Sequence, residues 1–232
     1  MSDTKEKYFN FPIQLLEDFL NNDKQVLNNI CDYAVYSLYL KLLKGNEEKR
    51  IKASASYFNL TIRDNNKTLK RGEMLTDSIP ANSPMVGLNV SIFFDYYKND
   101  KTEFEKITLL GYLAIKSILL NKSYCKITNN FWLARMDGKP KSVNEVYELS
   151  EPIRKYANEY QTKKIKNELR DNWNLNTYSR FTRGFYVSFK ITLEQLVFEA
   201  EKRRKSVKER QNKDAEKEAV KVALERLYGT RP

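Results

Sequence analysis

Apolar residues recur at helical spacing along most of this chain and alternate in only one late region. Long helical patterns cover about 25–44, 103–120 and 193–227. The alternating stretches 175–181 and 185–191 flank Thr182-Arg183-Gly184, which predicts a β-hairpin with Gly184 at positive φ. With only 7 Gly and 6 Pro, the chain is expected to be mainly α with small β-hairpins, an α+β fold.

An internal repeat organises the first four-fifths of the chain. The stretch FPIQLLEDFLNNDKQVLNNI from Phe11 aligns without gaps with LNVSIFFDYYKNDKTEFEKI from Leu88, and the likeness resumes with KASASYFNL from Lys52 against KITNNFWLA from Lys126. Chance similarity of two amphipathic helices is the alternative, but it does not explain the shared Asn-Asp-Lys and the common order of elements. Duplication is therefore the preferred interpretation.

The turn-rich segment 76–87, with Pro80 and Pro84, separates the two copies. The predicted domains are a first, degenerate unit (5–80), a second unit (85–193) and a charged C-terminal helix (194–232). In the second unit the pattern predicts, in order, the helix 103–120, a β-prone stretch at 123–128, a helix from Asn130 to Asp137-Gly138, helices at 145–157 and 160–169, and the hairpin. In the first unit, 56–60 and 66–71 take the places of the second and third helices, and no hairpin is expected before Pro80.

Positive charge is concentrated in one part of the sequence. The chain has 41 Lys and Arg against 30 Asp and Glu, a net charge of +11. Between Arg154 and Lys190, nine basic residues accompany three acidic ones. Such an uneven block indicates a site for a polyanion, whereas the alternative is a chain that is simply rich in lysine.

The order helix, short strand, helix, helix, hairpin over about 103–191 resembles the winged helix-turn-helix superfamily. The resemblance implies that Gln161–Arg170 is a recognition helix in the major groove and that Arg180, Thr182 and Arg183 form the wing tip. The segment from Asp137 to Asn158 is longer than the usual tight turn between the two helices. Two such units followed by a basic tail are similar to plasmid and phage replication initiator proteins, which bind repeated sites near an origin.

The candidate DNA-binding residues follow from this placement and from side-chain chemistry. Lys163, Lys166 and Arg170 share one helical face, while Ile165 and Leu169 point elsewhere. Gln and Asn side chains can pair with adenine, and Arg with guanine. The alternative is an ordinary solvated surface. The full set of candidates is Gln161, Thr162, Lys163, Lys164, Lys166, Asn167, Arg170, Arg180 and Arg183, with Lys67, Lys70 and Arg71 at the corresponding place in the first unit.

Several classes of function are disfavoured by what the sequence lacks. It has no His, its two Cys (Cys31 and Cys125) stand far apart, and it has no phosphate-binding, dinucleotide-binding or nucleophile-elbow motif. We therefore expect no enzyme, no cofactor and no metal. The polar start, the absence of an 18-residue apolar run and the isolated Cys predict a protein of the reducing cytoplasm with no membrane partner.

Two functional hypotheses remain. The leading one is a double-stranded DNA-binding protein of a plasmid, phage or mobile element, acting as a replication initiator or regulator. The alternative is a structural, assembly or accessory protein whose winged-helix units bind protein. The tail is expected to be a solvated helix; alternatively, Lys202-Arg203-Arg204-Lys205 touches DNA phosphates, or the last turns pair with a partner protein or a second copy. Most aromatic residues, such as Trp132, Trp173 and Phe185, are assigned to core packing rather than to base stacking.

Overall fold

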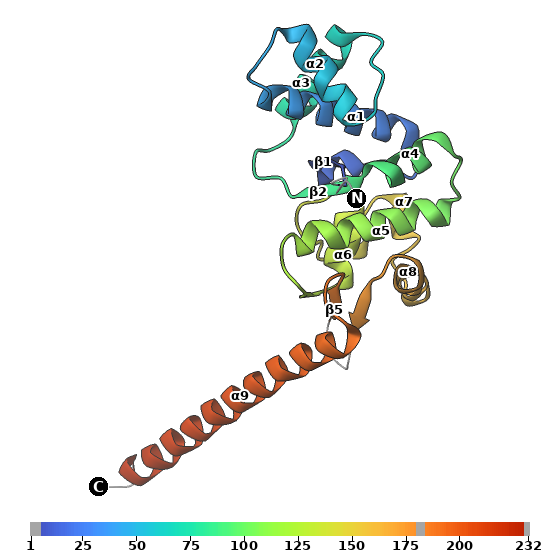
Figure 1. Cartoon of the computed structure of the whole chain (residues 1–232). Coiled ribbons are helices and arrows are strands. Elements are labelled where there is room, and N and C mark those ends of the chain that lie inside the picture. The colour runs from blue at the N-terminus through green and yellow to red at the C-terminus, as the bar shows by residue number, and fades with distance from the viewer. Residues whose placement is uncertain (1–5, 180–183, 230–232) are drawn as a thin grey trace.

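The computed structural model describes residues 6–179 and 184–229, which form an elongated body and one long projecting helix (Figure 1). The chain is mainly helical with two small antiparallel sheets, so the expected fold class is confirmed. In the described ranges, no helix is both long and apolar enough to cross a membrane.

The N-terminal part of the chain builds one end of the body. Its elements are β1 (Tyr8–Pro12), the 3-10 turn η1 (Ile13–Leu16), α1 (Asp23–Lys41), α2 (Glu47–Tyr57) and α3 (Asn65–Ser78). The prediction of a second helix at 56–60 is wrong, because α2 begins at Glu47 and already ends at Tyr57. The Asn46 side chain caps it by accepting from the Lys49 amide, and two glutamates follow in the first turn.

The next part of the chain builds the middle and the other end of the body. Its elements are β2 (Met85–Asn89), α4 (Val90–Lys98), α5 (Glu103–Leu119), β3 (Cys125–Ile127), α6 (Asn129–Met136), η2 (Val146–Glu148), α7 (Glu151–Arg154), α8 (Glu159–Asn172), β4 (Asn176–Tyr178) and β5 (Phe185–Ser188). Thr102 and Glu105 form a capping box at the start of α5, and the Thr128 hydroxyl caps α6 by accepting from the Phe131 amide. The helices predicted at 103–120, from Asn130 and at 160–169 are confirmed.

The helix predicted at 145–157 is wrong. That segment is broken into the turn η2 and the four-residue helix α7. The Ser150 amide and hydroxyl both donate to the Asp137 carboxylate. Leu149 and Ser150, which connect η2 to α7, have extended backbone conformations. Pro152 in the first turn of α7 lacks the amide hydrogen that a longer preceding helix would require.

The predicted hairpin is confirmed as part of a three-stranded sheet with strand order β3-β5-β4. Lys126 pairs with Tyr186, and Tyr186 pairs with Tyr178. Gly184 has φ +99°, as predicted, and a Cβ at this position would lie 2.4 Å from the Ile127 carbonyl oxygen. Only glycine satisfies both the left-handed backbone and this close approach.

The second sheet joins the N-terminal part to the rest of the body, and its register has internal symmetry. In β1 and β2, Asn10 pairs with Gly87, and the gap-free sequence alignment places these two residues at equivalent positions. If the two copies are exchanged, the pair Tyr8–Asn89 becomes the pair Met85–Pro12, which the sheet also contains. A local two-fold axis therefore passes through the Asn10–Gly87 pair, as expected of two copies that meet in an isologous contact.

The second stretch of sequence likeness does not correspond to equivalent structure. Residues 52–60 lie in α2 and the turn after it, whereas 126–134 lie in β3 and α6. The alignment matches Phe58 with Trp132, but Phe58 follows the end of α2 and stacks on Phe9, while Trp132 lies within α6. The aromatic match reflects a shared need for apolar packing, and the alignment of these two segments is wrong.

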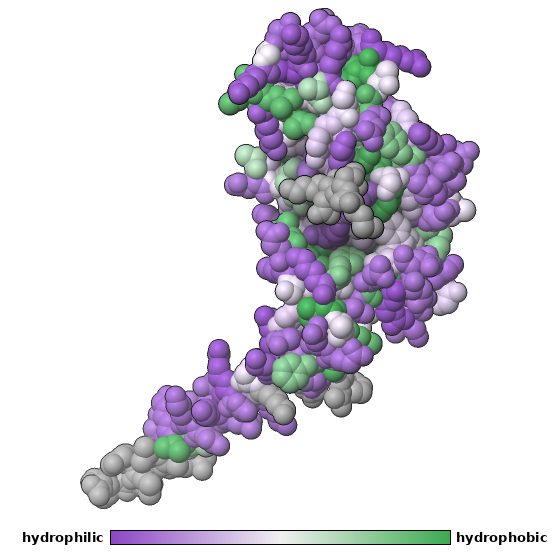
Figure 2. All heavy atoms as spheres, viewed as in Figure 1, coloured by the Kyte–Doolittle hydropathy of each residue, from purple (hydrophilic) through white to green (hydrophobic). Residues whose placement is uncertain are grey.

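One connected cluster of buried side chains runs from Phe9 to Val187 and includes residues of both sheets. Beyond it, α9 (Leu193–Gly229) leaves the body beside β4 and β5, so the predicted C-terminal helix is confirmed. Leu196 and Ala200 are buried against the body. Past them the helix projects, and its surface is mostly hydrophilic (Figure 2).

Candidate nucleic-acid interface

The helix α8 is fixed to the body by one apolar face. Ile165 and Leu169 are fully buried, and the Asn158 side chain caps the helix by accepting from the Gln161 amide. A Cβ on Gly111 of α5 would lie 3.2 Å from the Ile165 Cγ2 and 3.4 Å from the Leu169 Cδ1. The lack of a side chain at Gly111 therefore lets α8 pack closely on α5, which makes α8 a rigid platform.

The opposite face of α8 carries cations and an amide. Lys163 and Arg170 are exposed and Asn167 is half-buried on this face, whereas the half-buried Gln161 is four residues before Ile165 and lies beside the buried face. The Arg170 guanidinium donates a hydrogen bond to the Asn167 side-chain oxygen. No ion pair among the described residues involves a cation of α8. Glu159 and Asp171 are also exposed beside these cations, so the face has a small excess of positive charge and is open to a ligand.

Lys164 lies on a different side of α8. Its ammonium is 4.4 Å from the centre of the Phe104 ring of α5, which is a cation–π contact. Because the side chain is otherwise exposed, its charge still faces solvent. Lys164 therefore lies at the edge of the positively charged face rather than at its centre.

Two of the predicted DNA-binding residues on α8 are directed into the protein. Thr162 is 2% exposed, and its hydroxyl donates to the carbonyl oxygens of Asn158 and Glu159, so the prediction that Thr162 contacts DNA is wrong. The Lys166 ammonium donates to the Asn129 side-chain oxygen at 2.8 Å and lies 3.8 Å from the centre of the Phe185 ring. Burial lowers the pKa of Lys166 to about 8.

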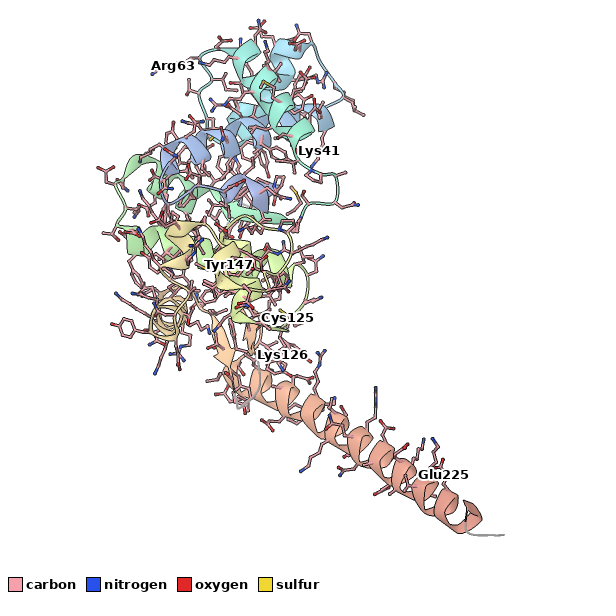
Figure 3. The ribbon with its side chains drawn as sticks, turned by 180° about the vertical axis from the view of Figure 1, so that it is seen from behind. Lys41, Arg63, Cys125, Lys126, Tyr147 and Glu225 are labelled. Atoms are coloured by element: carbon pink, nitrogen blue, oxygen red, sulfur yellow. The ribbon has the colours of Figure 1, made fainter. Side chains whose placement is uncertain are left out.

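The predicted wing-tip residues Arg180, Thr182 and Arg183 lie outside the described residues. The base of the hairpin is described, and Lys126 of β3 is exposed beside it. The Lys126 Cε is 3.5 Å from the position of a Cβ on Gly184. Figure 3 shows Lys126 at the end of the body where α9 begins.

The candidates of the first unit lie far from α8. Helix α3, with Lys67, Lys70 and Arg71, is at the end of the molecule opposite α8 (Figure 1). Lys67 and Lys70 are exposed, but the Arg71 guanidinium donates to Asn29 and forms an ion pair with Asp32 at 3.5 Å. Arg71 therefore holds α3 to α1, and the structure does not combine the two groups into one patch.

The basic block Arg154–Lys190 contributes less surface charge than its sequence suggests. Arg154 donates to the carbonyl oxygens of Tyr147 and Leu149, and the Lys190 ammonium donates to that of Asn121. Nearby Arg135 of α6 is 7% exposed, with its guanidinium over the Phe131 ring. Several cations of this region are therefore structural.

Sequence reasoning missed three exposed residues around α8. Lys155 precedes the helix, Tyr160 is 72% exposed in its first turn, and Lys126 lies beside the hairpin. The alternation of β3 gives the signal for Lys126, because its neighbour Ile127 is buried. For Lys155 the signal is its place in the basic block.

In the described part of the chain, no group of three or more His, Cys, Asp or Glu side chains is arranged to hold a metal ion. Comparison of the chain with protein-family models, with curated proteins and with solved structures finds no match. Function is therefore inferred from the geometry around α8.

Proposed function

We propose that this chain binds double-stranded DNA through α8, and that it serves a plasmid, phage or other mobile element as a replication initiator or regulator. The observation that carries the proposal is the two-sided character of α8. One side, with Ile165 and Leu169, is buried in the core, and the other presents Lys163 and Arg170 without ion-pair partners among the described residues.

The surroundings of α8 support this choice of ligand. The sheet order β3-β5-β4, with α6 and α8 packed on the same core, agrees with the resemblance to winged-helix proteins, in which the corresponding helix enters the major groove. Lys and Arg side chains bind phosphates as permanent cations, and the nearby Gln161 and Asn167 have amides that can pair with adenine.

The proposal is tested by the salt dependence of binding. Fluorescence anisotropy with a mixed-sequence duplex of about 30 base pairs gives the slope of log K against log salt concentration. The double variant Lys163→Gln/Arg170→Gln is expected to bind more weakly and to reduce that slope by about 2, because each phosphate contact contributes about 0.9.

The matched control is Lys41→Gln/Lys49→Gln, which removes the same net charge from exposed positions in the part of the body built by α1 and α2. We expect it to retain the wild-type slope. Equal slopes for the two double variants, or no preference of the wild type for duplex over heparin, contradicts the proposal.

Initiator and regulator differ in the arrangement of their sites. An initiator is expected to protect regularly repeated sites in the DNA beside its own gene, and a regulator a site at a promoter. Footprinting on that DNA distinguishes the two, and repeated protected sites favour the initiator.

A second candidate function, that of an assembly or accessory protein binding a protein partner, is favoured by one observation. Phe198 of α9 is 65% exposed and lines a groove of about 530 Å³ with Tyr124 and Ile191. Large exposed aromatic side chains are common at protein interfaces. Affinity capture from nuclease-treated lysate with wild type and Phe198→Ser tests this function, which requires a protein that the variant fails to retain.

A further inference from the structure

Six of the ten basic residues of α9 fall on one side of the helix by helical spacing, and the other four fall elsewhere. We call these six the basic stripe: Lys202, Arg203, Arg210, Lys213, Lys217 and Lys221. At about 100° per residue they fall within a sector of about 100°. The acidic residues farther along α9, from Glu209 to Glu225, lie outside this sector.

Like charges follow one another along part of the stripe. Solvated helices commonly place opposite charges at i and i+4, where they attract. In α9, Arg210–Asp214 and Lys221–Glu225 have this spacing. Lys213, Lys217 and Lys221 also follow one another at it, which brings like charges together in the middle of the stripe. Among the described side chains, no ion pair involves a cation of the stripe, so these exposed cations are available to an external anion.

The start of the stripe is fixed to the sheet that adjoins α8. The Arg203 guanidinium lies 5.2 Å from the centre of the Tyr124 ring, and the Tyr124 hydroxyl donates to Glu199 at 3.0 Å. Two residues after Tyr124, the exposed Lys126 lies beside the base of the hairpin. From there, Phe185 contacts the Lys166 ammonium of α8. The exposed Lys126 and Arg203 therefore lie on the sheet between α8 and α9, and the inward-directed Lys166 fastens α8 to that sheet.

The length of the stripe matches an extended polyanion. From Arg203 to Lys221 the helix rises by about 27 Å, which corresponds to about eight base pairs of duplex. Figure 1 shows α9 projecting from the body, and Figure 2 shows its surface to be mostly hydrophilic. A rigid linear anion is the ligand that can touch cations spread over this distance.

We propose that the basic stripe of α9 lies along the phosphate backbone of the duplex that α8 binds, extending the contact by about eight base pairs on one side. This inference rests on the proposed function and adds a second binding element to it. Its contacts are to phosphates, so α9 contributes affinity and salt dependence rather than sequence preference.

The experiment uses the full chain and the triple variant Arg210→Gln/Lys213→Gln/Lys217→Gln. Glutamine keeps a high helix propensity, and circular dichroism verifies that helix content is unchanged. On a duplex of about 30 base pairs, we expect the slope of log K against log salt concentration to fall by about 3. On a duplex of about 12 base pairs, which is too short to reach both elements, we expect a much smaller change.

The matched control is the triple variant Lys41→Gln/Lys44→Gln/Lys49→Gln, which removes the same net charge near the end of the molecule opposite α9, where Figure 3 places Lys41. If the α9 variant and this control have the same slope on the long duplex, the inference is wrong. The proposed function still stands in that case, provided that Lys163→Gln/Arg170→Gln reduces the slope. If neither the α8 nor the α9 variant changes binding, both proposals are wrong.

Discussion

The Lys166 ammonium donates a 2.8 Å hydrogen bond to the Asn129 side-chain oxygen, which joins the middle of α8 to the start of α6. The same ammonium lies over the Phe185 ring of β5 at 3.8 Å. One side chain thus connects the three elements around the proposed DNA-binding face. No acidic group forms an ion pair with it among the described residues, which leaves burial as the main influence on its charge.

This environment predicts a pH-dependent stability. Burial lowers the pKa of Lys166 to about 8 in the folded protein, below the value of about 10.4 for an unfolded lysine. Between these two values the unfolded state binds more protons, so the free energy of unfolding rises with pH in this window. Urea denaturation at about pH 7.5 and about pH 9.5 is expected to show a larger increase for wild type than for Lys166→Met.

The comparison with Lys166→Met cancels the titration of other groups, including tyrosines whose pKa values are raised by burial, such as Tyr33. Methionine preserves most of the apolar contact with Phe185. An identical pH dependence in the two proteins would show that the Lys166 ammonium is well solvated in the folded state.

The crossing of α1 and α3 depends on Gly72. A Cβ at this position would lie 2.3 Å from the Tyr36 Cβ and 2.7 Å from the Asp32 carbonyl oxygen. Because backbone atoms form part of this contact, the two helices must move apart in Gly72→Ala. We expect the free energy of unfolding to fall by about 2 kcal/mol or more, despite the better helix propensity of alanine.

Gly111→Ala is the informative comparison for Gly72→Ala. There the closest contact of a new Cβ is the Trp132 Cζ2 at 3.1 Å, which is part of a side chain that can adjust. A smaller loss of stability is therefore expected in urea denaturation. A Gly72→Ala protein as stable as wild type would mean that α1 and α3 are not in close contact.

Two tyrosines hold the base of α9. The Tyr124 hydroxyl donates to Glu199 at 3.0 Å, and the Tyr178 hydroxyl donates to Glu201 at 2.7 Å. Hydrogen bonds to charged acceptors contribute about 1.5–3 kcal/mol when they are protected from water. In Tyr124→Phe/Tyr178→Phe, we expect the first turns of α9 to exchange amide hydrogens faster, measured by mass spectrometry.

The control for this effect is Tyr147→Phe, at a side chain that is 72% exposed and lies away from α9 (Figure 3). It is expected to leave hydrogen exchange in α9 unchanged. If the double variant also leaves it unchanged, the base of α9 is held by Leu196 and Ala200 packing alone.

Most of the elements could be predicted from the sequence, because local signals and helical periodicity agree there. The Thr128 cap, the apolar spacing of Ile165 and Leu169, and the Gly184 turn each placed an element correctly. The segment before α8 was not predicted, because its conformation depends on the hydrogen bonds from Ser150 to Asp137. A contact between residues so far apart in sequence leaves no periodic pattern.

The candidate site was less predictable than the fold, since a helical wheel gives the direction of a side chain but not its partner. Lys163, Lys166 and Arg170 share a face by spacing, yet only Lys166 reaches Asn129 and Phe185. Those two partners come from α6 and β5, so the outcome was decided by tertiary packing. The partners of Arg71 could not be predicted for the same reason, because Asp32 lies on another helix.

Under the proposed function, Lys163 and Asn167 are expected to have separable roles. Lys163 is an exposed cation and would neutralise one phosphate. The Asn167 side chain is neutral, and its oxygen accepts from the Arg170 guanidinium, which positions both groups for base edges. Lys163→Gln should therefore reduce the salt slope by about 0.9 for every sequence, while Asn167→Ala should leave the slope unchanged.

Asn167→Ala should instead reduce the difference in affinity between preferred and random duplexes, by about 1–3 kcal/mol if the amide pairs with a base. Selection from a random duplex library identifies the preferred sequence, and competition anisotropy measures the difference for each variant. Tyr160→Phe, at a neighbouring exposed side chain, is a control with no change in charge. If Asn167→Ala reduces the salt slope and keeps its sequence preference, Asn167 acts only by holding Arg170 near a phosphate, and the bases are read by other residues.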